Sequence, residues 1–126
     1  MKVRCDFLVI GSGIAGLSFA LKAAAHGKVC VITKAKMDDC STNYAQGGIA
    51  AVMYEPDNLD KHVRDTMIAG AGYCNEEVVR MVVSEAPARI REMIEMGVDF
   101  DKKPYGTLDM DMEGGHTEHR ILHHKD

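Results

Sequence analysis

Three glycines behind a short apolar run constrain the fold of this chain more than any other feature. Gly11, Gly13 and Gly16 follow the run at residues 7–10 and open a helix-like stretch at residues 14–26. In such a pattern the first glycine allows a tight turn, the second lets backbone approach a pyrophosphate, and the third lets helix pack against strand. The N-terminus of the helix then offers free N–H groups to an anion. The motif therefore predicts a dinucleotide site, with a tight strand-to-helix turn alone as the alternative.

The segment after the glycines completes the unit that this motif requires. Gly27 ends the expected helix, and residues 28–33 form a second apolar run typical of a strand. Strand, helix and strand within about thirty residues indicate an α/β, Rossmann-like domain. A parallel sheet needs cover on both faces and more strands than the two that are plain here. We therefore expect residues 1–126 to be an incomplete domain that opens a larger protein, with a naturally short chain as the alternative.

Charge and cysteine usage exclude several classes of partner. The net charge is −4 and the pI is near 5.8, without a basic cluster, which argues against nucleic-acid binding. The apolar stretches fall well short of the roughly 20 residues that span a bilayer. None of the four cysteines forms a CxxC pair, so reduced thiols and a cytoplasmic location are expected. These cysteines are Cys5, Cys30, Cys40 and Cys74.

Beyond residue 34 the sequence predicts one long polar loop and then helices. The loop runs to about residue 48, and residues 49–53 suit either a strand or a short helix. One helix should start near Asn58, with Asp57 or Asn58 as its cap, and a second should start at Asn75. Pro87 should break or kink the second helix, and a further helix should run from there to Gly97. Residues 98–112 read as loop with one short strand.

The end of the second strand lacks an expected residue. Dinucleotide folds usually carry an acid about 20 residues past the glycines to bind the adenosine ribose. This chain has Thr33 and Lys34 there instead. A basic residue could accept the 2′-phosphate of NADP, so a nicotinamide module stays open. The polar, glycine-ended loop at residues 41–48 is unnecessary in such a module and favours a flavin.

Four segments together closely resemble the L-aspartate oxidases, a branch of the succinate dehydrogenase and fumarate reductase flavoprotein family. They are GSGIAG at 11–16, ITK at 32–34, STNYAQGGIA at 41–50 and EGGH at 113–116. The resemblance covers essentially the whole chain, but only the N-terminal part of a family member. It implies that residues 1–126 are part of an FAD-binding domain whose later substrate-capping and helical domains lie outside this chain. A Thr/Ser-Lys pair is usual in this family, which accounts for Lys34.

The resemblance implies noncovalent FAD. Membrane-bound members attach the flavin through a histidine, and this chain has Ser41 at that position. The glycine-rich motif would hold the pyrophosphate, Lys34 would lie at the adenosine end, and the 41–48 loop would wrap the flavin. The implied FAD-binding residues are Gly11, Ser12, Gly13, Ile14, Ala15, Gly16, Lys34, Ser41, Thr42, Asn43, Tyr44, Ala45, Gln46, Gly47 and Gly48.

The resemblance also implies an activity for the parent protein. L-Aspartate would be oxidised to iminoaspartate in NAD biosynthesis, with dioxygen or fumarate reoxidising the flavin and quinolinate synthase acting downstream. Glu113 matches the glutamate that faces the substrate's amino group, although by sequence alone it suits a solvated loop. The catalytic arginine lies later in the chain, so no catalytic residue is expected here and the fragment alone should be inactive. Alternatives are a soluble fumarate reductase or succinate dehydrogenase flavoprotein, or a noncatalytic dinucleotide-binding module.

Four clustered histidines raise the question of a metal site. They carry no accompanying cysteine, and their spacing matches no standard zinc arrangement, so we predict no metal site. The histidines are His116, His119, His123 and His124. His116 is expected to be a structural hydrogen-bonding residue, since the resemblance places it in the segment that follows the paired glycines.

Overall fold

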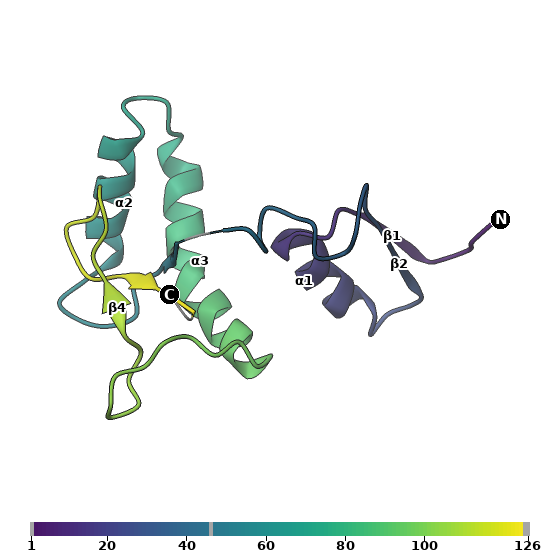
Figure 1. The fold of residues 1–126 in the computed structure, drawn as a ribbon. Helices are drawn as coiled ribbons and strands as arrows, with labels where there is room; N and C mark the ends of the chain where they lie inside the picture. The colour runs from purple at the N-terminus through teal and green to yellow at the C-terminus, as the bar shows by residue number, and fades with distance from the viewer. Residues whose placement is uncertain (1, 46, 125–126) are drawn as a thin grey trace. The chain divides into compact units, whose positions relative to one another are not determined.

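The computed structural model describes residues 2–45 and 47–124. These residues divide into two compact units, Met1–Gln46 and Gly47–Asp126, each of which is considered by itself (Figure 1). No helix in the described residues is long and apolar enough to cross a bilayer.

The first unit is the predicted strand–helix–strand. β1 (Phe7–Ile10) is followed by α1 (Ile14–Ala23) and β2 (Val29–Ile32), and the two strands pair in parallel with Phe7 opposite Val29. α1 ends three residues earlier than predicted. The N–H of His26 donates to the carbonyl of Ala23 at 2.9 Å, a tighter turn that leads out of the helix before Gly27.

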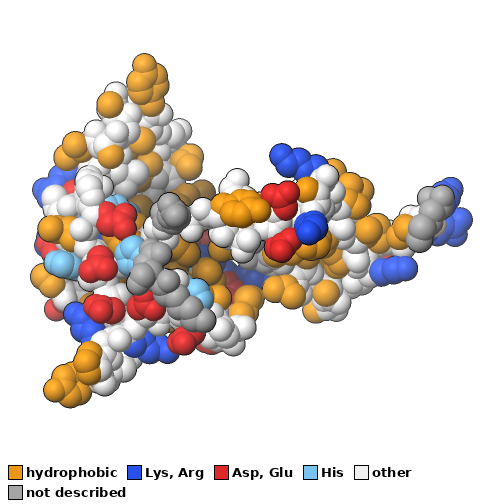
Figure 2. All heavy atoms as spheres, viewed as in Figure 1, with side chains coloured by type: hydrophobic (Ala, Val, Ile, Leu, Met, Phe, Trp, Pro, Cys, Tyr) orange, Lys and Arg blue, Asp and Glu red, His pale blue; other side chains and the backbone are white. Residues whose placement is uncertain are grey.

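Apolar side chains of this unit remain on its surface (Figure 2). Ile10 is 79% exposed and Leu21 is 66% exposed, although strand and helix residues of this kind normally pack inside a sheet domain. The described part of the unit has only two strands. The exposed faces agree with the expectation that this Rossmann-like sheet is incomplete.

The second unit packs two helices beside a small antiparallel sheet. α2 (Leu59–Ala69) and α3 (Glu76–Glu95) lie against each other, and the sheet has the order β3-β5-β4. Its strands are β3 (Ile49–Ala50), β4 (Met110–Asp111) and β5 (Ile121–Leu122). The structure thus resolves the 49–53 alternative in favour of a strand and confirms one short strand within 98–112.

Asparagine caps begin both helices, so that Asn58 and not Asp57 caps α2. The Asn58 side chain accepts the Lys61 N–H at 2.9 Å, and the Asn75 side chain accepts the Val78 N–H at 3.2 Å. Each cap satisfies an N–H group that has no partner within its helix.

Of the two effects predicted for Pro87, a break and a kink, the break does not occur. α3 continues through Pro87 as one helix. Proline removes one backbone hydrogen bond, but Val83 and Ile90 on either side are both buried, so tertiary packing holds the two halves together.

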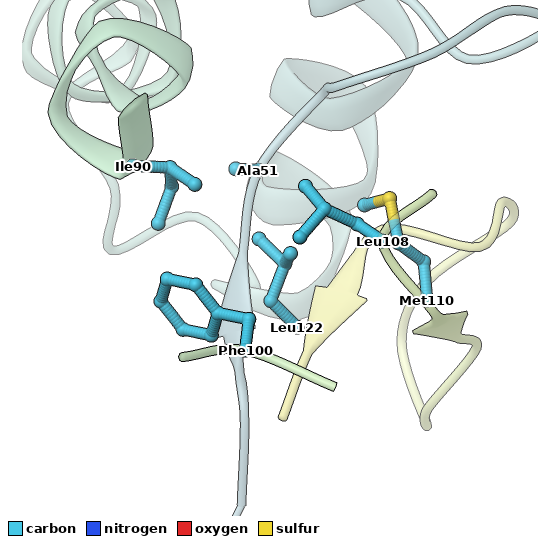
Figure 3. Packing of buried hydrophobic residues seen from close by; sticks show 6 residues of the cluster. All are labelled: Ala51, Ile90, Phe100, Leu108, Met110 and Leu122. Atoms are coloured by element: carbon cyan, nitrogen blue, oxygen red, sulfur yellow. The ribbon is translucent and has the colours of Figure 1, made fainter. Parts of the chain in front are cut away.

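The core of the second unit joins the end of α3 to the sheet (Figure 3). Ile90 from α3 and Phe100 from the following loop point toward Leu122 on β5, which is 1% exposed. The cluster consists of Ala51, Ile90, Phe100, Leu108, Met110 and Leu122. This packing fixes the sheet from which the segment of residues 112–120 projects.

Candidate functional site

A cavity of about 610 Å³ opens at the carboxyl ends of β1 and β2. Ligands of parallel α/β sheets bind at this edge because the strand-to-helix loops meet there. Six of its lining residues were predicted from the sequence: Gly11, Ser12, Gly13, Lys34, Ser41 and Thr42. The structure therefore brings the glycine motif, the end of β2 and the start of the polar loop around one space.

The glycines have the backbone roles that the motif requires. Gly11 has a φ of +110°, in the left-handed region that favours glycine. A Cβ on Gly16 would lie 2.3 Å from the carbonyl oxygen of Gly11, so any side chain there would push α1 away from the turn. Gly13 is the N-cap of α1 and offers no capping side chain.

The hydroxyl of Thr42 connects the polar loop to the start of α1. The Ile14 N–H donates to Thr42 Oγ1 at 3.1 Å, which satisfies one of the unpaired N–H groups of the helix. Ser12, which is 3% exposed, donates its hydroxyl to Thr33 Oγ1 at 3.4 Å. Two side-chain contacts therefore hold the cavity walls together.

These residues fit the pyrophosphate of a dinucleotide. The first hydrogen bond within α1 runs from the Leu17 N–H to the Gly13 carbonyl at 3.0 Å. The N–H groups of Ala15 and Gly16 come before it and therefore have no acceptor within the helix. The first turn of α1 carries no acidic residue, and Lys34 lines the same cavity. Backbone donors, a helix N-terminus and a cation are the groups that bind phosphate.

The later part of the polar loop does not line this cavity. Asn43, Tyr44 and Ala45 are exposed, and Gln46 lies outside the described residues. Gly47 is also exposed. Gly48 lies against β5, where a Cβ would meet Ile121 Cγ2 at 2.2 Å. The roles implied for these residues at the flavin stay predictions.

Glu113 lies in a turn between β4 and β5. The His116 N–H donates to the Glu113 carbonyl at 3.1 Å, and Gly115 has a φ of +85°, so the paired glycines close a tight turn. The Glu113 side chain is 49% exposed, and its Oε1 lies 3.4 Å from Nε2 of His123. The carboxylate is therefore accessible to a ligand from solvent and has a histidine beside it.

A buried ion cluster behind this turn anchors it to α2. Arg120 is 0% exposed and donates to Asp57 through Nε and Nη2, at 2.8 and 2.7 Å. Its Nη1 donates to Asp65 Oδ2 at 2.7 Å. Asp65 Oδ2 also accepts the backbone N–H and the hydroxyl of Thr117, at 2.9 and 2.8 Å. The turn that carries Glu113 is thus fastened to the unit's interior.

The cluster shifts two titration equilibria. Burial by itself would raise the pKa of Asp65, but the hydrogen bonds from Thr117 and Arg120 lower that pKa to about 2. Burial lowers the pKa of His62, and the nearby positive charge of Arg120 lowers it further. His62 and His116 pack edge to face with ring centroids 5.6 Å apart, and His116 Nδ1 lies 3.3 Å from Arg120 Nη1. His116 is therefore part of a structural network, as expected.

Within residues 2–45 and 47–124, no group of three or more His, Cys, Asp or Glu side chains is arranged to hold a metal ion. The clustered histidines instead make separate contacts. His119 Nδ1 lies 3.1 Å from the Met110 carbonyl oxygen, while His123 faces Glu113.

The family model described as FAD binding domain matches residues 6–126. The chain belongs to the FAD binding domain family. This membership agrees with the α/β fold and with the glycine-rich cavity at the end of β1.

Relatives of this FAD binding domain include L-aspartate oxidases. The chain is 54% identical over 121 residues to L-aspartate oxidase 2-b, chloroplastic, of Nicotiana tabacum, covering 96% of this chain and 19% of the relative. It is 48% identical over 128 residues to L-aspartate oxidase of Vibrio cholerae, covering 98% and 24%. The chain is thus homologous to L-aspartate oxidases and spans between 19% and 24% of the length of these two relatives.

Solved structures with the same fold include a quinol fumarate reductase and Sdh1. The E. coli quinol fumarate reductase superposes with a TM-score of 0.89 at 28% identity, covering 97% of this chain and 22% of that chain. Mycobacterium smegmatis Sdh1 in complex with UQ1 superposes with a TM-score of 0.86 at 34% identity, covering 94% and 20%. The FAD binding domain described here therefore has the α/β fold of fumarate reductase and Sdh1 flavoproteins.

Sequence reasoning missed several residues of this FAD binding domain. Thr33, Asp39 and Cys40 line the cavity without having been predicted. Thr33 follows β2 directly, so its position at the sheet's carboxyl edge was a usable signal. The partners of Arg120 gave no such signal, because Asp57 and Asp65 are 63 and 55 residues away in the sequence.

Proposed function

We propose that this chain is the N-terminal, FAD-binding part of an enzyme that oxidises L-aspartate to iminoaspartate in NAD biosynthesis. Dioxygen or fumarate would reoxidise the enzyme, and quinolinate synthase would consume the product. The observation that carries the proposal is 54% and 48% identity to two L-aspartate oxidases over nearly the whole chain. Glu113, next to paired glycines, supports the amino-acid substrate.

The cavity at β1 and β2 supports dinucleotide binding by named groups. The N–H groups of Ala15 and Gly16 would bind the pyrophosphate, and Lys34 would lie toward the adenosine end. The hydroxyls of Ser41 and Thr42, which line the same cavity, would donate hydrogen bonds to the cofactor. When bound, FAD supplies the two-electron acceptor, while the protein supplies binding and orientation.

Glu113 would determine the class of substrate. A carboxylate attracts the ammonium group of aspartate through a charge-assisted hydrogen bond, and succinate has no such group. The exposure of Glu113 leaves its carboxylate open to a ligand. Groups that bind the substrate carboxylates would come from later parts of the protein, so this chain by itself is expected to be inactive.

The deciding experiment is the visible spectrum of the full-length protein that carries this chain. The purified protein is mixed anaerobically with L-aspartate and, separately, with succinate. Bleaching of the flavin by aspartate alone is the expected result. Absence of flavin, or bleaching by succinate, would overturn the proposal.

The same preparation tests the proposed noncovalent attachment. Because Ser41 offers no imidazole for a bond to the flavin, acid precipitation should leave all of the yellow colour in the supernatant. A yellow protein pellet would contradict noncovalent binding.

A fumarate reductase or succinate dehydrogenase flavoprotein is the second candidate. The superposition on the E. coli quinol fumarate reductase, with a TM-score of 0.89, favours it. Glu113 argues against it, because a carboxylate repels a dicarboxylate that lacks an ammonium group. Bleaching by succinate alone would favour this candidate, and a colourless protein would favour a noncatalytic dinucleotide module.

A further inference from the structure

His123 lies where two parts of the proposed site meet. β5 pairs with β3 through Ile49 and Leu122, so the residue after β5 continues toward Gly48 at the end of the polar loop. On its other side β5 pairs with β4, whose chain leads directly into Glu113. The His123 backbone is held as well, since its carbonyl accepts the Asp101 N–H at 2.9 Å.

The His123 ring faces two carboxylates. Nε2 lies 3.4 Å from Oε1 of Glu113 and 3.8 Å from Oδ2 of Asp111. The His123 side chain is 13% exposed, whereas Glu113 is 49% exposed. A fixed ring therefore lies beside a carboxylate that would otherwise be free to change rotamer. Acidic and histidine side chains lie next to one another on the face of this unit seen in Figure 2.

The same ring packs against the glycine end of the polar loop. A Cβ added to Gly48 would lie 3.2 Å from Cε1 of His123, which is closer than ordinary van der Waals contact. A side chain at position 48 would also collide with Ile121 Cγ2 at 2.2 Å. Gly48 thus lets the loop approach the ring closely at Cε1, next to Nε2, the nitrogen that faces Glu113.

We propose that His123 is a positioning residue that orients the Glu113 carboxylate toward the ammonium group of an α-amino dicarboxylate substrate. The proposal rests on the function proposed above, in which Glu113 contacts that ammonium group. A proton on Nε2 attracts the carboxylate and restricts its rotamers. The substrate then meets a carboxylate that is already oriented, so less conformational entropy is lost on binding.

Two amide substitutions at one position test the proposal in the full-length protein with bound FAD. In His123→Gln the side-chain amide reaches as far as Nε2 and keeps a donor near Glu113. In His123→Asn the amide is one methylene shorter and cannot reach. We expect H123N to raise KM for L-aspartate about tenfold, because a carboxylate that is no longer oriented loses more conformational entropy when the substrate binds, with kcat little changed. H123Q should stay within about threefold of the wild type.

A double-mutant cycle with Glu113→Gln shows whether the effect passes through Glu113. The H123N effect on KM should disappear in the E113Q background, because the carboxylate to be oriented is gone. His26→Asn, the same change at an exposed histidine, should alter neither KM nor the flavin spectrum. The flavin spectrum and the melting temperature of each variant check that it is folded.

The outcomes separate this inference from the proposed function. If E113Q leaves KM for aspartate unchanged, the proposed role of Glu113 fails. If E113Q raises KM but H123N leaves KM unchanged, only the role of His123 fails. The same conclusion follows if H123N raises KM equally with and without Glu113. Equal losses in H123N and H123Q would likewise overturn the positioning role. If H123N does not retain FAD, the deciding variant is H123Q, measured with Glu113 present and with E113Q. An increase in KM of more than about threefold that is the same in both backgrounds would contradict the proposal.

Discussion

Arg120 and Asp57 form a fully buried, two-bond ion pair, although 63 residues separate them in the sequence. The two hydrogen bonds, of 2.8 and 2.7 Å, join the segment that enters α2 to the start of β5. Asp65 binds the third nitrogen of the same guanidinium. Buried charges of this kind are tolerated only when both partners are present, because each ion has lost its hydration.

Replacing Asp57 with asparagine should therefore destabilise the protein strongly. The change leaves part of the Arg120 charge buried without compensation, and we expect a loss of about 3 kcal/mol in the free energy of unfolding. Asp60→Asn is the matched control, because Asp60 pairs with Arg80 at 2.8 Å but is 85% exposed, and it should cost less than about 1 kcal/mol. Equal losses in the two variants, measured by urea denaturation, would contradict the importance of burial.

Gly16→Ala should reduce FAD binding. The new Cβ would lie 2.3 Å from the Gly11 carbonyl, and a backbone atom cannot move aside without displacing the start of α1. The displaced N–H groups would no longer meet the pyrophosphate, so the full-length protein should purify with most of its flavin missing. Gly114→Ala is the control, since a Cβ there has open space and the backbone is outside the left-handed region. Retention of full flavin content in G16A would refute the packing argument.

Thr42→Val should weaken FAD binding without unfolding the protein. Valine keeps the shape of threonine but cannot accept the Ile14 N–H, which now bonds to Thr42 Oγ1 at 3.1 Å. A loss of about 1 kcal/mol, or roughly fivefold in Kd, is expected for one such bond. Fluorescence titration of the apoprotein with FAD measures this change. Thr42→Ser keeps the hydroxyl and should bind like the wild type, whereas equal weakening in both variants would point to packing instead.

The lowered pKa of Asp65 predicts a specific loss of stability in acid. The folded-state pKa of Asp65 is about 2, below the ordinary value of 3.8. The ionised carboxylate therefore makes its full contribution to the free energy of unfolding above pH 3.8. The contribution disappears as the pH falls through about 2, and it amounts to roughly 2 kcal/mol. Asp65→Asn should flatten the stability curve between pH 5 and about pH 2 in urea titrations. A curve as steep as that of the wild type would show that the carboxylate is not held as described.

His62 should make the free energy of unfolding depend on pH in a range above that of Asp65. Its folded-state pKa is lowered from 6.5, so the unfolded chain takes up its proton first and stability falls as the pH drops below 6.5. His62→Gln should reduce this dependence, because glutamine does not titrate. His26→Gln, at an exposed histidine, should leave the slope unchanged. Identical slopes in the wild type and H62Q between pH 7 and about pH 5 would contradict the effect of burial.

Local sequence patterns predicted β1, α1 and β2, the start of α2 near Asn58 and the start of α3 at Asn75, because each depends on neighbouring residues. A glycine turn, an apolar run and a capping side chain act within a few positions of one another. The same locality explains why Gly11, Ser12, Gly13 and Lys34 could be assigned to one cavity. The glycine motif follows β1 and Lys34 follows β2. These two strands are parallel, and the carboxyl ends of neighbouring parallel strands meet at one edge of the sheet.

The tertiary structure alone decided the remaining features. Ile49 and Ala50 form a strand because β5 lies beside them, and α3 continues through Pro87 because Val83 and Ile90 are buried. The pairing of Arg120 with Asp57, and of His123 with Glu113, depends on how the chain returns to itself. The sequence by itself determined the nucleotide-binding turn, since its chemistry is carried by adjacent backbone. The buried ion pair required the fold, because hydration would separate its charges unless packing held them together. The histidine beside Glu113 also required the fold, because the pairing of β4 with β5 brings these two residues together.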